Sequence, residues 1–128
     1  MAYLKPPAFV SKIFNPLAMR LGIGGSTALE VPRRRSGTPQ RIPVIPVEID
    51  GVRYVVSTRG ESQWVRNLRV AGRVQLGGRA YSASEVPLDE RGPIIDAYRA
   101  KAGRTVVTYF KQLPDAADHP SFRLDPAD

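Results

Sequence analysis

The dipeptide Asp50-Gly51 constrains the fold most, because it separates two apolar segments and is a preferred turn of tight β-hairpins. We expect one strand at 41–49, apolar on both faces, and a returning strand at 52–58. Pro43 and Pro46 cannot donate to a ladder, so each should face an edge, a bulge or a ligand. The sequence therefore predicts a hairpin whose first strand is interrupted by prolines.

Other turn and periodicity signals predict the remaining elements. Helices are expected at 62–72, with Ser62 as N-cap and Gly72 as stop, and at 89–102. Residues 106–110 fit a helical turn or a strand, and 114–120 fit a loop. Further strands are expected at 28–34, at 73–76 and 79–86 around Gly77-Gly78, and at 121–124, the last at a sheet edge. Many short strands with helices in the connections predict a small α+β barrel or roll.

The first 25 residues form a separate part of the prediction. Apolar residues at spacings of three and four, with basic residues around them, indicate an amphipathic helix at 8–20, and glycines at 22–25 indicate a linker. We therefore divide the chain into 1–25, helix and linker, and 26–128, the barrel. The helix either packs on the domain or contacts an anionic membrane. A membrane span and a signal peptide are not expected.

Charge indicates an anionic partner. The net charge is +7, with 15 Arg and 4 Lys, and the surplus is concentrated in 1–41 and 53–79. The absence of Cys and the single histidine, His119, argue against thiolate or multi-histidine metal sites, and we expect no metal. An enzyme so poor in acid–base groups most easily takes its chemistry from an organic cofactor. Nucleic acid is not expected, because aromatic residues are not interleaved with the arginines.

Three segments are candidates for binding. The run 33–41 places four Arg, two hydroxyl groups and a glycine turn together, and Arg35 and Arg41 flank the turn. The run 57–62 connects a strand to a helix through Gly60, which allows close approach of a ligand to the backbone. Asn67 lies inside the helix, where Asn is unfavourable, so we expect it to hydrogen-bond a fixed group. Each run also fits an ordinary basic turn, connection or helix.

The segment 51–69, with Trp64-x-x-Asn67-Leu68 after a strand and turn, resembles the deazaflavin-dependent nitroreductase family of actinobacteria. The segments 35–44 and 119–124 are similar to that family's phosphate loop and last strand. The resemblance covers about residues 30–124. It implies a split β-barrel, like that of FMN-binding oxidases, and coenzyme F420, a deazaflavin with a phosphodiester and a polyglutamate tail.

The resemblance also implies a site and a reaction, hydride transfer from reduced F420 to a quinone or another electron-poor acceptor. Tyr98 and Tyr109 are candidate proton donors. Trp64 and Asn67 would close the pocket. The phosphate and tail would meet Arg35, Ser36 and Arg41; Pro43 and Val44 would pass under the ring system; and Ser57, Thr58, Arg59 and Gly60 would lie along it.

Two alternatives remain at this point. One is a split barrel that binds FMN or haem, and the other is a non-redox fatty-acid or lipid-binding protein at the membrane surface. Localisation is expected to be cytoplasmic, with the helix at 8–20 as a candidate contact with the inner face of the membrane. Split barrels often pair so that two chains wall each site, which makes a homodimer compatible with the resemblance.

Overall fold

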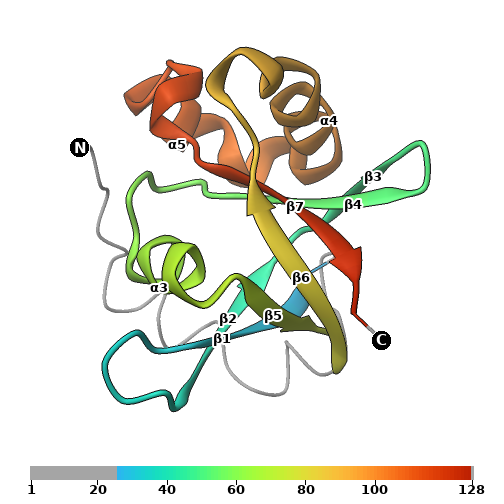
Figure 1. The fold of residues 1–128 in the computed structure, drawn as a ribbon. Helices are drawn as coiled ribbons and strands as arrows, with labels where there is room; N and C mark the ends of the chain where they lie inside the picture. Colours follow the sequence, from blue (N-terminus) through green and yellow to red (C-terminus); the bar gives the residue numbers. More distant parts are fainter. Residues whose placement is uncertain (1–25, 128) are drawn as a thin grey trace.

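A computed structural model describes residues 26–127, which form a curled antiparallel sheet with helices in its connections (Figure 1). The helices are α3 (Gln63–Ala71), α4 (Gly92–Ala102) and α5 (Val107–Gln112), with short 3₁₀ turns η2 (Leu88–Glu90), η3 (Gly103–Val106) and η4 (Ala116–Asp118). The strands are β1 (Thr27–Pro32), β2 (Pro39–Val44), β3 (Val47–Ile49), β4 (Val52–Val56), β5 (Arg73–Leu76), β6 (Arg79–Glu85) and β7 (Ser121–Pro126). The predicted α+β split-barrel architecture is confirmed.

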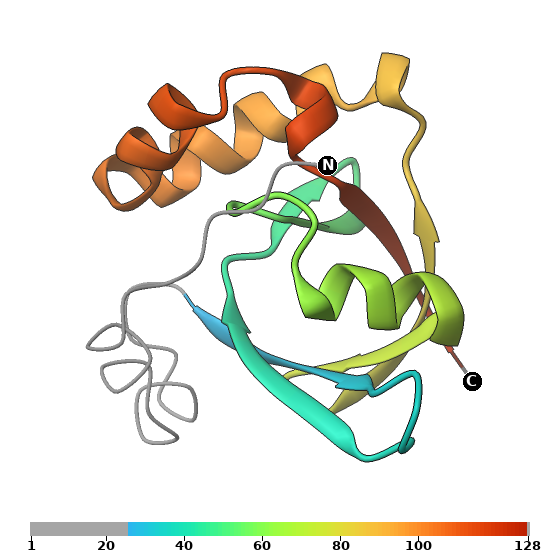
Figure 2. The same ribbon diagram turned by 90° about the vertical axis from the view of Figure 1, so that its left-hand side faces the viewer.

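The strand order β2-β1-β5-β6-β7-β4-β3 explains the curl of the sheet. β2 and β3 follow one another in the chain but lie at the two opposite edges, so residues 45–46 cross from one edge to the other (Figure 2). The prediction of one strand at 41–49 is therefore wrong. Pro46 lies in the break, where a ladder would have required an N–H that proline lacks. Pro43 lies in the edge strand β2, opposite Ala28, as its missing donor required.

Both predicted hairpins are confirmed. Asp50 and Gly51 have φ values of 51° and 80°, and Gly77 and Gly78 have values of 57° and 83°. Two successive residues with positive φ are typical of the type I′ turn, whose twist matches that of the flanking strands.

The last strand corrects a second prediction. β7 was expected at an edge, but it lies between β6 and β4, with Phe122 opposite both Val55 and Glu85. Phe122 and Leu124 are each 1 % exposed, so β7 contributes alternate side chains to the core. The segment 106–110, for which helix and strand were both open, is helical: Val106 ends η3, and the rest lies in α5.

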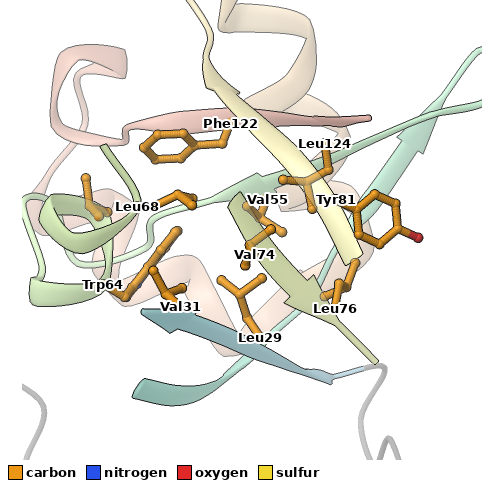
Figure 3. Packing of buried hydrophobic residues seen from close by; sticks show 11 residues of the cluster. Leu29, Val31, Val55, Trp64, Leu68, Val74, Leu76, Tyr81, Phe122 and Leu124 are labelled. Atoms are coloured by element: carbon orange, nitrogen blue, oxygen red, sulfur yellow. The ribbon is translucent and has the colours of Figure 1, made fainter. Parts of the chain in front are cut away.

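Two hydrophobic clusters hold the fold. In the first, α3 lies against the concave side of the curled sheet through Trp64, Val65 and Leu68 (Figure 3). Its other buried members are Leu29, Val31, Val55, Val74, Leu76, Tyr81, Phe122 and Leu124. In the second, α4, α5 and η3 cover the other end of the barrel; its buried members are Val47, Val56, Val86, Ile94, Ile95, Tyr98, Val106 and Phe110.

The expected helix at 8–20, and with it the division into 1–25 and 26–128, lies outside the described residues. Within residues 26–127, no helix has the length and apolar character needed to cross a membrane.

Candidate functional site

The connection between β4 and α3, residues 57–62, forms a compact turn that we call the site turn. The hydroxyl of Ser57 donates to the carbonyl of Gly60 at 2.6 Å, and the N–H of Ser62 donates to the same carbonyl at 2.8 Å. Gly60 has a φ of 84°, a conformation that side chains with a Cβ rarely adopt. The sequence Ser-x-x-Gly-x-Ser therefore closes the turn on itself before the helix begins.

Two tyrosines from the helical layer reach the site turn. The hydroxyl groups of Thr58 and Tyr98 share a hydrogen bond, and the Arg59 Nη2 donates to the Tyr109 hydroxyl at 3.2 Å. The Arg59 guanidinium carbon also lies 5.1 Å from the centre of the Tyr109 ring. Burial raises the pKa of Tyr98, so its phenol stays protonated across the neutral range. The two candidate proton donors are thus brought to the predicted turn.

The site turn also contains two buried polar atoms with no hydrogen-bond partner among the described residues. These are the Nε of Arg59 and the Oγ of Ser62. Buried donors in native proteins are almost always paired, and an exception calls for an explanation such as a bound group. The Arg59 Nε only donates, whereas the Ser62 hydroxyl can donate or accept, so one group with acceptor atoms would satisfy both.

The basic run folds into the turn between β1 and β2, which we call the arginine turn (Arg33–Thr38). The Arg33 N–H donates to the Thr38 carbonyl at 2.9 Å, and the hydroxyl groups of Ser36 and Thr38 lie 2.8 Å apart. Gly37 takes a φ of 76°. Arg35 and Ser36 are exposed at the tip of this turn.

Asn67 joins the arginine turn to α3. Its Oδ1 accepts from the backbone N–H of Arg34 at 3.1 Å and from the Arg34 Nη1 at 2.7 Å, and its Nδ2 donates to the Gln40 Oε1 at 2.7 Å. The Nη2 of Arg34 reaches Gln63 at 2.8 Å, one residue beyond Ser62. The expectation that Asn67 bonds a fixed group is confirmed. The predicted basic run and strand-to-helix turn thus meet at the start of α3.

Other predicted site residues lie elsewhere. Arg41 pairs with Glu30, with Nε and Oε1 3.7 Å apart, while Val44 packs against the first core cluster. Pro43 follows Arg41 by two residues in β2 and so shares its face, opposite to that of Val44. Trp64 is 9 % exposed and belongs to the core, with its ring centre 6.0 Å from that of Phe122.

The sequence missed an ionic network behind the site turn. Arg69 donates to both carboxylate oxygens of Glu61, and to those of Glu85 at 2.7 and 2.8 Å. Arg91 extends the network to Glu85 at 3.1 Å. The hydrogen bond from Arg69 lowers the pKa of Glu61, which is only 5 % exposed. Arg69 is thus held by two carboxylates, although its own side chain remains 31 % exposed.

The sequence alone gives little indication of this ionic network. From its neighbours alone, Glu61 fits either a favourable charge at the helix start or a partner for Arg59. Its partner Arg69 lies eight positions along the chain, and Glu85 sixteen further. Only the packing of α3 beside the end of β6 brings the three together.

A shallow hollow of about 330 Å³ lies apart from the site turn. It is lined by residues of β1, β2, β5 and β6, by Gly37 of the arginine turn and by Ala127. It includes Glu30 and Arg73 and no residue of the range 57–62.

A curled antiparallel barrel with helices in its connections defines a split-barrel protein, and the solved structures that share this fold include three of stated function. One is an F420 reductase, at 15 % identity and a TM-score of 0.54, with 97 % of each chain covered. A FAD-binding protein from Mesorhizobium loti matches at 14 % identity and 0.54, over 89 % of this chain and 91 % of that one. The heme storage protein HutZ from Vibrio cholerae matches at 17 % identity and 0.57, over 88 % and 87 %.

The family of the chain is identified by a match over most of its length. The model of the F420H(2)-dependent quinone reductase family matches residues 10–114, and the chain belongs to this family. It is accordingly an F420-dependent oxidoreductase, and its cofactor is F420. No curated protein matches the chain.

Proposed function

We propose that the chain binds coenzyme F420 at the site turn and transfers a hydride from its reduced form to a quinone or another electron-poor acceptor. One observation carries the assignment to this turn: Arg59 and Ser62 each present a buried polar atom without a partner among the described residues. The coenzyme is rich in acceptor oxygens and is anionic through its phosphodiester and tail. Its acceptor oxygens would supply the hydrogen-bond partners that these two groups lack.

The position of the arginine turn supports the same location for the coenzyme. Arg34 contacts Gln63 beside the site turn, so an anion at Ser62 would lie near the arginine turn as well. We assign the tail to Arg35 and Ser36, which are exposed there, and the ring system to the backbone of 57–60. Arg41 would join them by leaving Glu30, since an exposed pair at 3.7 Å contributes little stability.

The remaining predicted residues take supporting roles in this proposal. Val44 and Trp64, which pack in the first hydrophobic cluster, would support the site from the core. Pro43 leaves the edge strand β2 without an N–H at that point, which keeps the strand open beside a ligand. Asn67 holds the backbone of Arg34 and thereby sets where the arginine turn stands relative to α3.

When bound, the reduced deazaflavin supplies the hydride. The residues of the chain orient the two reactants and exclude water from the place of transfer. A quinone that accepts a hydride also needs a proton to become a hydroquinone. Tyr98 and Tyr109 hold hydroxyl groups at the site turn, and the raised pKa of Tyr98 keeps its phenol protonated at neutral pH.

Fluorescence titration with F420 tests the proposal directly. Arg59→Ala should weaken binding by about tenfold or more, because a guanidinium bond to an anion is lost. Arg35→Ala should weaken binding of the tailed coenzyme more than of an analogue without the tail. Arg104→Ala, which removes an exposed arginine of η3, is the matched control for net charge. Equal small losses in all three variants would contradict the assignment.

The acceptor and the membrane contact need their own measurements. Oxidation of reduced F420 by a soluble quinone, followed by absorbance, should be fast in the wild type and slowed in Arg59→Ala. Contact of the segment 8–20 with a membrane predicts that the full chain sediments with anionic vesicles and stays in solution with neutral ones. A homodimer predicts twice the mass of 14.1 kDa in sedimentation.

A further inference from the structure

His119 is the single histidine of the chain, and the proposed function gives it no role. It precedes β7, and its side chain is completely buried. Phe110 of α5 stacks on its ring, with the ring centres 4.1 Å apart and the planes inclined by 23°. A polar ring enclosed in this way needs hydrogen-bond partners, and the partners show what it does.

Both ring nitrogens of His119 face backbone carbonyl oxygens. Nδ1 lies 2.8 Å from the oxygen of Ser57, and Nε2 lies 2.7 Å from the oxygen of Leu113. Carbonyl oxygens only accept, so each ring nitrogen bonds its carbonyl only when it carries a hydrogen. The imidazolium ion donates at both positions, and either neutral tautomer donates at one.

Ser57 connects the ring to the site turn. Its carbonyl faces the His119 Nδ1, and its N–H donates to the carbonyl of Pro120 at 2.8 Å. Its hydroxyl closes the turn on Gly60 at 2.6 Å. The segment His119-Pro120 thus holds Ser57 through both its N–H and its carbonyl, and Ser57 holds the turn.

We propose that His119 is a positioning residue of the coenzyme site, whose Nδ1–H fixes the Ser57 carbonyl and so the turn on which F420 rests. The stacking on Phe110 holds the ring itself, and Nε2 adds a second hydrogen bond, to the Leu113 carbonyl, when the ring is the imidazolium ion. The inference depends on the proposed function, because it assumes that the coenzyme lies along the site turn. It adds a residue that does not touch the coenzyme and acts through a backbone carbonyl.

Replacing His119 by Asn or by Gln distinguishes the two hydrogen bonds of its ring. The amide nitrogen of an Asn side chain falls near the place of Nδ1, and that of Gln falls near Nε2. His119→Asn therefore keeps the bond to Ser57, whereas His119→Gln keeps the bond to Leu113. Both lose the stacking on Phe110 and one hydrogen bond, so we expect them to lose similar amounts of stability.

Coenzyme affinity should differ between these variants. The dissociation constant for F420 should stay within about twofold of the wild type in His119→Asn and rise by about tenfold in His119→Gln. In the coenzyme-free protein, the amide signals of Thr58 and Gly60 should move in His119→Gln and stay in place in His119→Asn. Equal affinities and equal amide shifts in the two variants would overturn the proposal.

The unaltered protein gives an independent test, which stands even if both variants fail to fold. Because the chain has one histidine, a long-range ¹H–¹⁵N spectrum reports its two ring nitrogens without ambiguity. We expect a hydrogen on Nδ1, and a ring protonated at Nε2 alone would overturn the role of His119. If Arg59→Ala leaves F420 binding unchanged, the proposed site itself is wrong. If Arg59→Ala loses binding while the two His119 variants bind F420 with equal affinity, only the positioning role of His119 is wrong.

Discussion

Replacing Asn67 by Ala tests the link between the arginine turn and α3. Asn67 is 4 % exposed and makes three hydrogen bonds, two of them to Arg34 and one to Gln40. A neutral hydrogen bond contributes about 1 kcal/mol to stability and one to a charged group about 1.5–3 kcal/mol. Because Arg34 is exposed and can turn to water, its charged bond counts near the lower end. The expected loss is about 3 kcal/mol, or roughly 10 °C in Tm for a domain of this size.

Urea unfolding measures this loss directly. Trp64 is the single tryptophan of the chain and lies in the core against Phe122, so its fluorescence reports the unfolding of the domain. The slope of free energy against urea should stay unchanged, because the surface exposed on unfolding does not change. Gln63→Ala, which removes one exposed bond to Arg34, is the control and should cost less than about 0.5 kcal/mol. A loss below about 1 kcal/mol in Asn67→Ala would refute the reasoning.

Three further outcomes follow from the structure. Arg69 lowers the pKa of Glu61, so the wild type should be more stable than Glu61→Gln, with the full difference present above the ordinary pKa of 4.5. This difference in stability should disappear as the pH falls through the lowered pKa, and a difference that grows on acidification would contradict the assignment. Burial raises the pKa of Tyr98, so in an ultraviolet titration Tyr98→Phe should remove the tyrosine that ionises at higher pH, and loss of an early one would be the opposite result. Gly51→Ala should cost about 1 kcal/mol because its φ is 80°, while Gly92→Ala, in open space without a positive φ, should cost almost nothing in the same denaturation assay.

The parts of the fold that the sequence predicted are those determined locally. Asp50-Gly51 and Gly77-Gly78 require positive φ at two successive residues, and few residue types allow it. The helix at 63–71 has its stop at Gly72, which takes a φ of 64° within the sequence range predicted. In each case the residues that decide the structure are neighbours in the chain.

The parts that were missed depend on distant pairings. β7 looked like an edge strand because nothing in the segment Ser121–Pro126 states which strands flank it. It pairs with β4 and β6, both of them far away in the sequence. The break at Pro46 was visible as a missing donor, but the return of β3 to the opposite edge follows only from closure of the sheet.

Among the site residues, too, those with a local signal were predicted and those that depend on distant contacts were not. Asn67 was identified from its poor fit to a helix interior, and its bonds to Arg34 and Gln40 explain why it is there. His119 carried no such signal, because a histidine before a strand gives no indication of two carbonyl partners. Its contact with Ser57, 62 positions away in the chain, arises only in the folded structure.

The measurement that tests the central claim most directly is a ¹H–¹⁵N NMR titration of the protein with F420. We predict that the amide signals of Arg59, Gly60 and Ser62 shift most, together with those of the arginine turn. Shifts confined to the hollow around Glu30 and Arg73, with the site turn unchanged, would contradict the placement of the coenzyme at the start of α3.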